Sequence, residues 1–376
     1  MDYSKKAIAL HKKKRGKIEI KSKVRLRNKA DLSLVYTPGV AAVSSAIGYD
    51  KKLSWQLTNR VNQVAVVTDG TAILGLGNLG AEAAMPVMEG KAVIFKEFAG
   101  IDAIPLCIDT TDTEEIIKFC KQIAPSFGGI NLEDISAPRC FAITERLEKE
   151  SSIPVFHDDQ DGTAIVVLAA LINACKVTGK AMKEMKIVIN GAGAAGLAVA
   201  RLLLAVGVGD LVLLDSQGII CQGRTEMNPV KCQLALKTNR KKLMGTLAVA
   251  MAGADVFIGV SQANLVTPEM VKSMNQGPII FAMANPLPEI MPDLAIKAGA
   301  AVVGTGRSDF PNQINNALVF PGIFRGLLDN RVKQVTTQIK IKAALALAGV
   351  IKPKKNQLLP LVTDKRVVKA IAKAVR

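Results

Sequence analysis

Residues 186–205 read KIVINGAGAAGLAVARLLLA. The apolar run 186–190 predicts a strand that leads into Gly191, and residues 197–205 predict a helix that leaves Gly196. A strand, a G-x-G-x-x-G turn and a helix in this order form the dinucleotide-binding turn of a Rossmann-type sheet, where free backbone N–H groups face the pyrophosphate. The loop residues Gly191, Gly193, Ala194, Ala195 and Gly196 are therefore predicted to bind a dinucleotide cofactor.

The next predicted strand, residues 210–214, ends at Asp215, which lies 22 residues after Gly193. An acid at this position accepts hydrogen bonds from the hydroxyls of the adenosine ribose. A carboxylate there would repel a 2′-phosphate, and the following Ser216 and Gln217 add no cation. The sequence therefore favours NAD over NADP, with NADP as the alternative.

The G-x-G-x-x-G pattern also occurs at residues 75–80, where its context is weaker. Glu97 follows at a suitable distance, but Pro86 falls in the segment that should be helical, and Asp69-Gly70 interrupts the preceding strand. We expect a tight turn that packs a helix against a strand, with a dinucleotide site as the less favoured alternative.

Short apolar runs alternate with helix-like segments on both sides of a long apolar segment at residues 162–179. Strands that alternate with helices predict an α/β fold with parallel sheets. We predict an N-terminal α/β substrate domain over residues 1–158. A C-terminal Rossmann-type dinucleotide-binding domain should follow over residues 159–376 and end in a helical, lysine-rich tail.

The positive charge of the chain is concentrated at its two ends. The formal net charge is +17; residues 1–30 contribute +10, residues 331–376 contribute +11, and the 300 residues between them carry −4. A basic chain suggests an anionic partner such as nucleic acid. However, the slightly acidic body and an aromatic content of 4% argue against a nucleic-acid groove. A nucleic-acid-binding protein is kept as the alternative from another class, and we expect neither a nucleic acid nor a membrane as partner.

The remaining composition indicates a cytoplasmic protein. Six cysteines have no regular spacing, which is typical of reduced thiols and not of a disulfide or zinc framework. The N-terminal residues lack a signal-peptide pattern. The longest uncharged apolar run, residues 162–175, has 14 residues, fewer than the ~20 that a membrane-spanning helix needs.

Acidic pairs occur where two predicted strands end, at Glu133-Asp134 and at Asp158-Asp159. The carboxyl ends of parallel strands meet at one edge of a sheet, so these oxygens can converge. Carboxylate sets of this kind suit Mg²⁺ or Mn²⁺. Helix caps and surface turns are the alternative explanation for the same residues.

Other side chains are weaker candidates. Lys91 leads into the apolar run 92–95, predicted as a strand, and desolvation beside a metal would lower its pKa toward that of a base; most lysines are simply solvated. Tyr36 is either functional or a half-buried core phenol. Asn285 and Asn316 either bind a substrate carboxylate or form turns.

Together these segments resemble the malic enzyme family, in particular its short bacterial and archaeal members. The matching blocks, in chain order, are YTPGVA at 36–41, TDGTAILGLGNLG at 68–80, EGKAVIFKEFAGIDAIPL at 89–106, INLEDI at 130–135, PVFHDDQDGTAIV at 154–166, INGAGAAGLAVAR at 189–201, ADVFIGVS at 254–261, ANPLPEI at 284–290 and TGRSDFPNQINNALVFPGIFRG at 305–326. Blocks of this length in this order are far more specific than either glycine pattern alone.

The resemblance implies metal-dependent oxidative decarboxylation of L-malate to pyruvate and CO₂, with reduction of NAD(P)⁺. By motif position, the metal ligands would be Glu133, Asp134 and Asp159. Lys91 would be the general base and Tyr36 the acid that protonates enolpyruvate. Asn285 and Asn316 would bind malate, with Asn285 also beside the cofactor.

The resemblance further implies a homodimer or larger homo-oligomer, in which the Tyr36 segment of one chain can complete the site of its partner. A malolactic-type enzyme, which converts malate to lactate with bound NAD, is the alternative within the family. Two departures stand out. Ala72 replaces an arginine that larger members use on the malate carboxylate, and Asp161 adds negative charge near the predicted metal.

Overall fold

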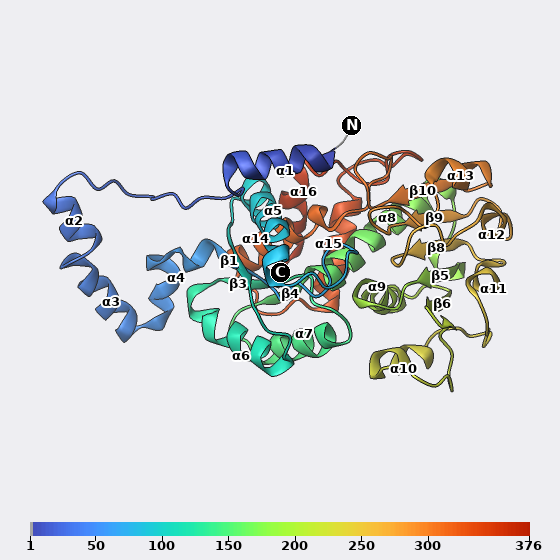
Figure 1. Cartoon of the computed structure of the whole chain (residues 1–376), viewed down its shortest axis with the longest axis horizontal. Coiled ribbons are helices and arrows are strands. Elements are labelled where there is room, and N and C mark those ends of the chain that lie inside the picture. The colour runs from blue at the N-terminus through green and yellow to red at the C-terminus, as the bar shows by residue number, and fades with distance from the viewer. Residues whose placement is uncertain (1–2) are drawn as a thin grey trace.

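The computed structural model describes residues 3–376. Two sheets lie side by side along an elongated body, and an arm of short helices projects from one end (Figure 1). Both sheets consist of parallel strands joined by helices, apart from one short antiparallel strand. The predicted α/β architecture with a Rossmann-type C-terminal part is therefore confirmed.

The first sheet has the strand order β2-β1-β3-β4. Its strands are β1 (Gln63–Thr68), β2 (Asp102–Cys107), β3 (Gly129–Leu132) and β4 (Val155–His157). The helices that connect them are α5 (Ala81–Ala99), α6 (Thr113–Ile123) and α7 (Arg139–Glu150). Residues 64–67 and 129–132 are buried, as in parallel strands that are covered on both faces.

One expected strand is wrong. The run 92–95 after Lys91 belongs to helix α5, which continues through Pro86 and ends at Gly100 in the left-handed conformation. A run of four apolar residues does not distinguish a strand from a turn of buried helix, and here Met88, Ala92 and Phe95 form a buried helical stripe.

The second sheet has the strand order β10-β9-β8-β5-β6-β7. Its strands are β5 (Lys186–Asn190), β6 (Asp210–Asp215), β7 (Gly218–Ile219), β8 (Val256–Gly259), β9 (Ile279–Ala282) and β10 (Val302–Thr305). Its helices are α9 (Ala194–Ala205), α10 (Pro229–Ala235), α11 (Leu247–Met251), α12 (Pro268–Lys272) and α13 (Pro292–Lys297). The strand order reverses between β5 and β8, and ligands bind at such a switch point in open α/β sheets.

A central block of helices joins the two sheets. A π-helical turn, η4 (Asp158–Gly162), runs into the buried helix α8 (Thr163–Thr178), on which α15 (Thr337–Ala348) packs. The short turn η6 (Asn316–Leu318) precedes α14 (Phe320–Asn330), and α16 (Arg366–Ala374) ends the chain. α14 and α16 pack against each other, and α14 also contacts α5 and β3 of the first sheet.

Aromatic rings of α14 pack against α5 and β4 of the N-terminal half. The ring centroid of Phe95 lies 4.7 Å from that of Phe320 and 5.3 Å from that of Phe324. Phe324 also meets Phe156 of β4, with centroids 5.9 Å apart. The C-terminal segment therefore supplies part of the core of the N-terminal sheet.

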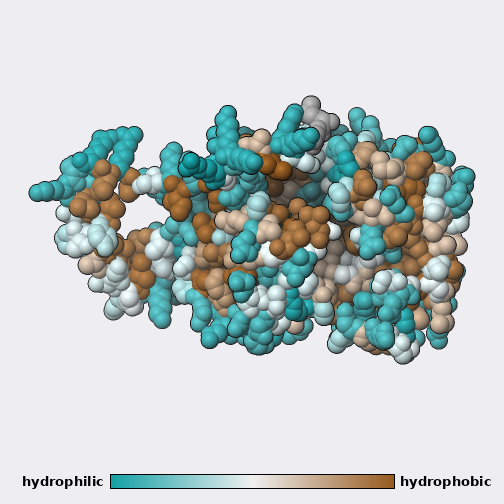
Figure 2. Space-filling view, in the orientation of Figure 1, coloured by the Kyte–Doolittle hydropathy of each residue, from teal (hydrophilic) through white to brown (hydrophobic). Residues whose placement is uncertain are grey.

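The N-terminal segment lies largely on the surface. Helix α1 (Tyr3–Lys14) lies beside the body, whereas α2 (Lys29–Val35), α3 (Gly39–Tyr49) and α4 (Ser54–Leu57) form the projecting arm (Figure 1). Among the described residues, none in these four helices is buried. Apolar side chains nevertheless gather on the arm (Figure 2), where Leu34 is 77% and Tyr49 97% exposed.

Two helical stretches are long and apolar enough to meet the criterion for a membrane span, Lys29–Tyr49 and Asp158–Thr178. The second is 67% buried inside the protein and is the core helix α8 with its preceding turn. The first is broken between Tyr36 and Pro38 into helices of 7 and 11 residues. Each is shorter than the ~20 residues that a spanning helix needs.

Candidate active site

A pocket of about 600 Å³ lies between the carboxyl ends of the two sheets, and we call it the inter-sheet pocket. The first sheet and α5 contribute Lys91, Glu133, Asp134 and Asp159. The second half of the chain contributes, among others, Ala195, Val260, Ser261, Asn285 and Asn316. The structure thus brings together seven predicted site residues from distant parts of the sequence, namely Lys91, Glu133, Asp134, Asp159, Ala195, Asn285 and Asn316.

Three carboxylates converge at one edge of the first sheet. Glu133 and Asp134 follow β3, Asp159 lies in the turn after β4, and these strands are parallel neighbours. One ligand atom from each residue lies within 4.8 Å of the others. The backbone N–H of Asp134 donates to Oδ2 of Asp159 at 2.9 Å, which fixes the two residues relative to each other.

Burial and mutual repulsion make this carboxylate cluster costly to ionise. Burial raises the pKa of Glu133 well above its ordinary value. Burial and the neighbouring charge of Asp159 raise the pKa of Asp134 to about 7. Oδ2 of Asp134 is buried and has no hydrogen-bond partner within residues 3–376. A hard divalent cation would satisfy these oxygens and relieve their repulsion, so the residues present fit Mg²⁺ or Mn²⁺.

Lys91 contacts this cluster from helix α5. Its Nζ lies 3.0 Å from Oε1 of Glu133, forms an ion pair with Asp158 and lies 4.6 Å from the ring centroid of Phe320. Burial opposes the charged ammonium, but the carboxylates of Asp158 and Glu133 outweigh it and raise the pKa of Lys91. The expectation of a lowered pKa for Lys91 is therefore wrong for the protein without metal. That expectation included a neighbouring metal ion, whose positive charge would offset the two carboxylates.

Both asparagines line the same pocket. Asn285 follows β9, and Asn316 begins η6. Gly75 of the first glycine pattern and the preceding Leu74 also line it, and none of the residues of that pattern lines the pockets beside the Rossmann loop. Gly75 has a positive φ, and a Cβ there would lie 2.7 Å from the carbonyl oxygen of Asn285. The pattern therefore forms a tight turn at the inter-sheet pocket.

Lys17 is a cation that sequence reasoning missed. Together with Lys91 it provides the cationic side chains that line the pocket, and Ala72 lies in the same wall. Its Nζ donates to the carbonyl oxygen of Pro86 at 2.7 Å and lies 3.3 Å from the point that a Cβ on Gly90 would occupy. Lys17 belongs to a run of basic residues that is typical of a solvated surface. Its place at the pocket follows from the path of the folded chain, which the run itself does not indicate.

Two predicted residues lie apart from this pocket. Asp161 turns away and accepts a hydrogen bond from Nζ of Lys340 at 2.6 Å, so its charge is paired there. Tyr36 ends α2 on the projecting arm and is 66% exposed. It is neither a half-buried core residue nor part of the site formed within one chain.

A groove continues from the inter-sheet pocket along the second sheet. Val260 and Ser261 line both that pocket and a pocket of about 440 Å³, the loop pocket, which contains Gly191 and Gly193. Gly191 has a φ of +115°, and a Cβ on Gly196 would meet the carbonyl oxygen of Gly191 at 1.7 Å. Gly193 precedes the first residue of α9, Ala194, so the free N–H groups of the helix face the groove as a pyrophosphate requires.

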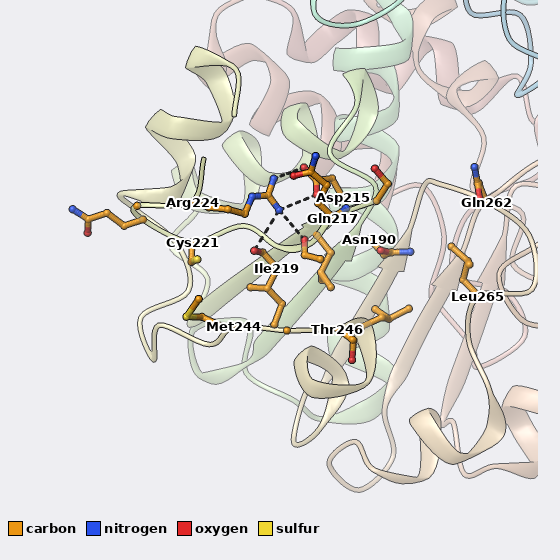
Figure 3. Close-up of a pocket in the computed structure, with 17 residues that line it drawn as sticks. Asn190, Asp215, Gln217, Ile219, Cys221, Arg224, Met244, Thr246, Gln262 and Leu265 are labelled. Carbon is orange, nitrogen blue, oxygen red and sulfur yellow. Dashed lines mark hydrogen bonds and ion pairs between the residues drawn. The ribbon is translucent and has the colours of Figure 1, made fainter. Parts of the chain in front are cut away.

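The groove ends in a third pocket of about 780 Å³, the hairpin pocket, beside the β6–β7 turn (Figure 3). Asp215, Ser216 and Gln262 line both this pocket and the loop pocket. Asp215 binds two cations, Arg224 and Lys231, which the sequence spacing did not indicate. Burial opposes its ionisation, but both donors outweigh it and lower the pKa of Asp215 to about 2.

Comparison with known proteins agrees with this geometry. Residues 15–148 match the family model for the malic enzyme N-terminal domain, and residues 160–376 match the model for the malic enzyme NAD-binding domain. The chain belongs to the malic enzyme family. As a member of that family it is an NAD(P)-dependent oxidoreductase that decarboxylates malate, and a divalent metal is expected for the family.

Relatives of this malic enzyme differ in their named cofactor and activity. The chain is 55% identical to the bifunctional malic/malolactic enzyme of Bacillus subtilis, with 100% of this chain and 92% of that protein covered. It is 53% identical to the NAD-dependent malic enzyme of Geobacillus stearothermophilus, covering 96% and 76%. The solved NAD-dependent malic enzyme of Thermotoga maritima has 48% identity, a TM-score of 0.96 and 98% of each chain covered.

Proposed function

We propose that the inter-sheet pocket binds L-malate beside a divalent metal held by Glu133, Asp134 and Asp159, and that the groove along the second sheet binds the dinucleotide. The observation that carries this proposal is the shared wall at Val260 and Ser261, which joins the carboxylate cluster to the glycine loop. The test is a malate titration with NAD⁺ and NADP⁺, with and without Mg²⁺ or Mn²⁺. Malate-dependent NAD(P)H and pyruvate in equal amounts are the expected result; their absence contradicts the proposal.

When bound, the metal supplies Lewis-acid stabilisation of negative charge on the C2 oxygen of the substrate, and the dinucleotide accepts the hydride from C2. Glu133, Asp134 and Asp159 would supply the negative charge that balances the metal; the first two are buried and the third is half-buried. Asn131 supports the set, since its side chain donates to Oε2 of Glu133 at 3.0 Å. These contacts orient the carboxylates before any ligand arrives.

In this scheme Lys91 would accept the proton of the C2 hydroxyl as a neutral amine, once a bound metal offsets the carboxylates that otherwise keep it charged. Its contact with Glu133 places the nitrogen directly beside the carboxylate cluster, within reach of a substrate oxygen there. Asp158, which pairs with Lys91 and is fully buried, would stabilise the ammonium that forms when Lys91 takes up this proton. The Phe320 ring excludes water from one side of the ammonium.

Asn285, Asn316 and Lys17 bind the substrate carboxylates. The two asparagine amides donate neutral hydrogen bonds. Lys17 supplies a positive charge in the same wall of the pocket as Ala72, the position at which larger family members have an arginine. The side chain of Lys17 donates to the neutral carbonyl of Pro86, and partial burial lowers the pKa of Lys17. A malate carboxylate would be a stronger acceptor than that carbonyl.

Tyr36 acts on the site of a second copy, as the acid that protonates enolpyruvate. The projecting arm leaves apolar side chains exposed that one chain does not cover, including Leu34 at 77%. A homodimer in which each arm packs on its partner buries these side chains and delivers Tyr36 to a pocket that otherwise lacks a phenol. Sedimentation analysis tests the dimer, and a monomer at micromolar concentration contradicts it.

A second activity, conversion of malate to lactate with retained NAD, is favoured by the relative from Bacillus subtilis that is named bifunctional. Lactate formed without net NADH would support it, and pyruvate as the sole product would exclude it. We also propose a cytoplasmic location, since all six cysteines are free thiols, as is typical of proteins in a reducing compartment.

A further inference from the structure

The acceptor positions of Asp215 are already occupied by the protein. Oδ1 accepts from the N–H of Gln217 at 3.0 Å and from Nη1 of Arg224 at 2.9 Å. Oδ2 accepts from Nη2 of Arg224 at 2.5 Å and from Nζ of Lys231 at 2.7 Å. An ionised carboxylate offers about four such positions. A ribose hydroxyl would therefore have to displace one of these donors to reach Asp215.

The charge around Asp215 is positive, not negative. Two cations face one carboxylate, and the side chains of Arg224, Lys231 and Asp215 are only 14%, 17% and 12% exposed. Partial burial keeps these charges from being screened fully by solvent. A 2′-phosphate arriving here meets a site with a net charge of +1 from these groups, so the repulsion expected from Asp215 alone is cancelled.

Arg224 is the member of this cluster that faces the ligand space. It lines the hairpin pocket together with Asp215 and Ser216, and Figure 3 shows its guanidinium beside Asp215. Its other acceptors, the carbonyls of Gly218 and Ile219, are 3.2 and 3.4 Å away, at and beyond the long end of the usual N–H···O range. Its Nε is buried and has no partner in the described part of the chain. A phosphate is a better acceptor for the guanidinium fork than these carbonyls.

We propose that Arg224 binds the 2′-phosphate of NADP, while Lys231 holds Asp215 neutralised, so that this enzyme uses NADP as well as NAD. The proposal rests on the proposed function in one respect, namely that the adenosine end of the cofactor lies in the hairpin pocket. Asp215 then positions the two cations and does not bind the ribose hydroxyls. Lys231 remains on Oδ2 when Arg224 turns to the phosphate.

The test compares binding of 2′,5′-ADP with binding of 5′-AMP by calorimetry, so it needs no turnover. Arg224→Leu should weaken 2′,5′-ADP at least about tenfold, the loss expected for one charge-assisted contact, and change 5′-AMP less than about twofold. Arg224→Lys should restore part of the loss. Lys237→Met, which removes an exposed cation outside all three pockets, is the matched control and should change neither.

Asp215→Asn separates the two roles of Asp215. If it anchors the cations, loss of its charge strengthens 2′,5′-ADP several-fold and leaves 5′-AMP unchanged. If it reads the ribose, 5′-AMP weakens, and the proposal is overturned. It is also overturned if Arg224→Leu weakens both nucleotides equally or neither. Circular dichroism confirms that each variant is folded. Normal nucleotide binding without malate turnover would instead point to failure of the proposed function.

Discussion

Nζ of Lys91 lies 3.0 Å from Oε1 of Glu133, so a proposed proton acceptor and a proposed metal ligand form one ion pair. The pair shares the pocket with Asp134 and Asp159. Loss of the amine should therefore affect the proton transfer while leaving the oxygen ligands in position. That separation makes Lys91 the most informative residue to change.

We expect Lys91→Ala to lower kcat by about 10²- to 10⁴-fold, the range for removal of a general base, while Mn²⁺ still binds. Steady-state kinetics and a metal titration measure the two effects. Lys96→Ala is the matched control, since Lys96 lies on the same helix but is 59% exposed and pairs with Asp102. Wild-type turnover of Lys91→Ala would refute its assigned role.

Metal binding should strengthen as the pH rises through about 7. Burial and Asp159 raise the pKa of Asp134 to about 7, so protons compete with the metal below that pH. Without metal, Asp134 keeps its proton in the folded chain up to about pH 7, whereas in the unfolded chain it releases the proton above pH ~4. The free energy of unfolding therefore falls as the pH rises from about 4 to 7. The rise in Tm on adding Mg²⁺ should therefore be larger at pH 8 than at pH 6. An equal rise at both, or no change of this pattern in Asp134→Asn, would contradict the prediction.

Lys17→Met should raise the KM for malate about tenfold and leave the KM for the dinucleotide unchanged. One charge-assisted contact to a substrate carboxylate has about that magnitude. Lys14→Met, an exposed cation of the same basic segment, serves as control. If Lys17→Met keeps the wild-type KM for malate, another group binds the carboxylate.

Two inactive variants should restore each other if Tyr36 crosses to the partner. In a mixed dimer of Tyr36→Phe and Lys91→Ala, one site carries both changes and the other carries neither. Co-expression with random pairing should then recover about a quarter of wild-type activity, since half of the dimers contain one intact site. Activity no higher than that of the separate variants would show that each chain uses its own tyrosine.

Phe324→Ala should destabilise the fold by about 3–5 kcal/mol, as for other fully buried aromatic residues. The ring contacts Phe95 of α5 and Phe156 of β4, so its loss opens a cavity under the first sheet. Denaturant unfolding measures the change. A loss below about 1 kcal/mol would mean that α14 contributes little to that core.

The sequence predicted the parts of the site that regular strands position. Glu133, Asp134 and Asp159 follow neighbouring parallel strands, whose ends must meet, and the glycine loop joins a strand to a helix in a fixed geometry. Such relations depend on local pattern and on sheet topology, both of which the spacing of apolar residues indicates.

Residues positioned by irregular segments could not be predicted. Arg224 reaches Asp215 by the path of the turn after β7, and Lys17 reaches Pro86 from a segment 69 residues earlier. The run 92–95 after Lys91 reads as a strand because four apolar residues fit either state, and only the packing of α5 beside α14 decides between them. Tyr36 does not line the pocket of its own chain, so its proposed role requires a second chain.

The packing of Phe324 on Phe95 and Phe156 also sets the order in which the protein becomes stable during synthesis. The first sheet ends at residue 157, yet α14, which packs on β3 and on α5, begins at residue 320. At ribosomal rates of about 5–20 residues per second, the nascent sheet waits roughly 10–30 s for that helix. During this interval its apolar face is available to chaperones, and truncation before α14 would leave the emerging chain prone to aggregation.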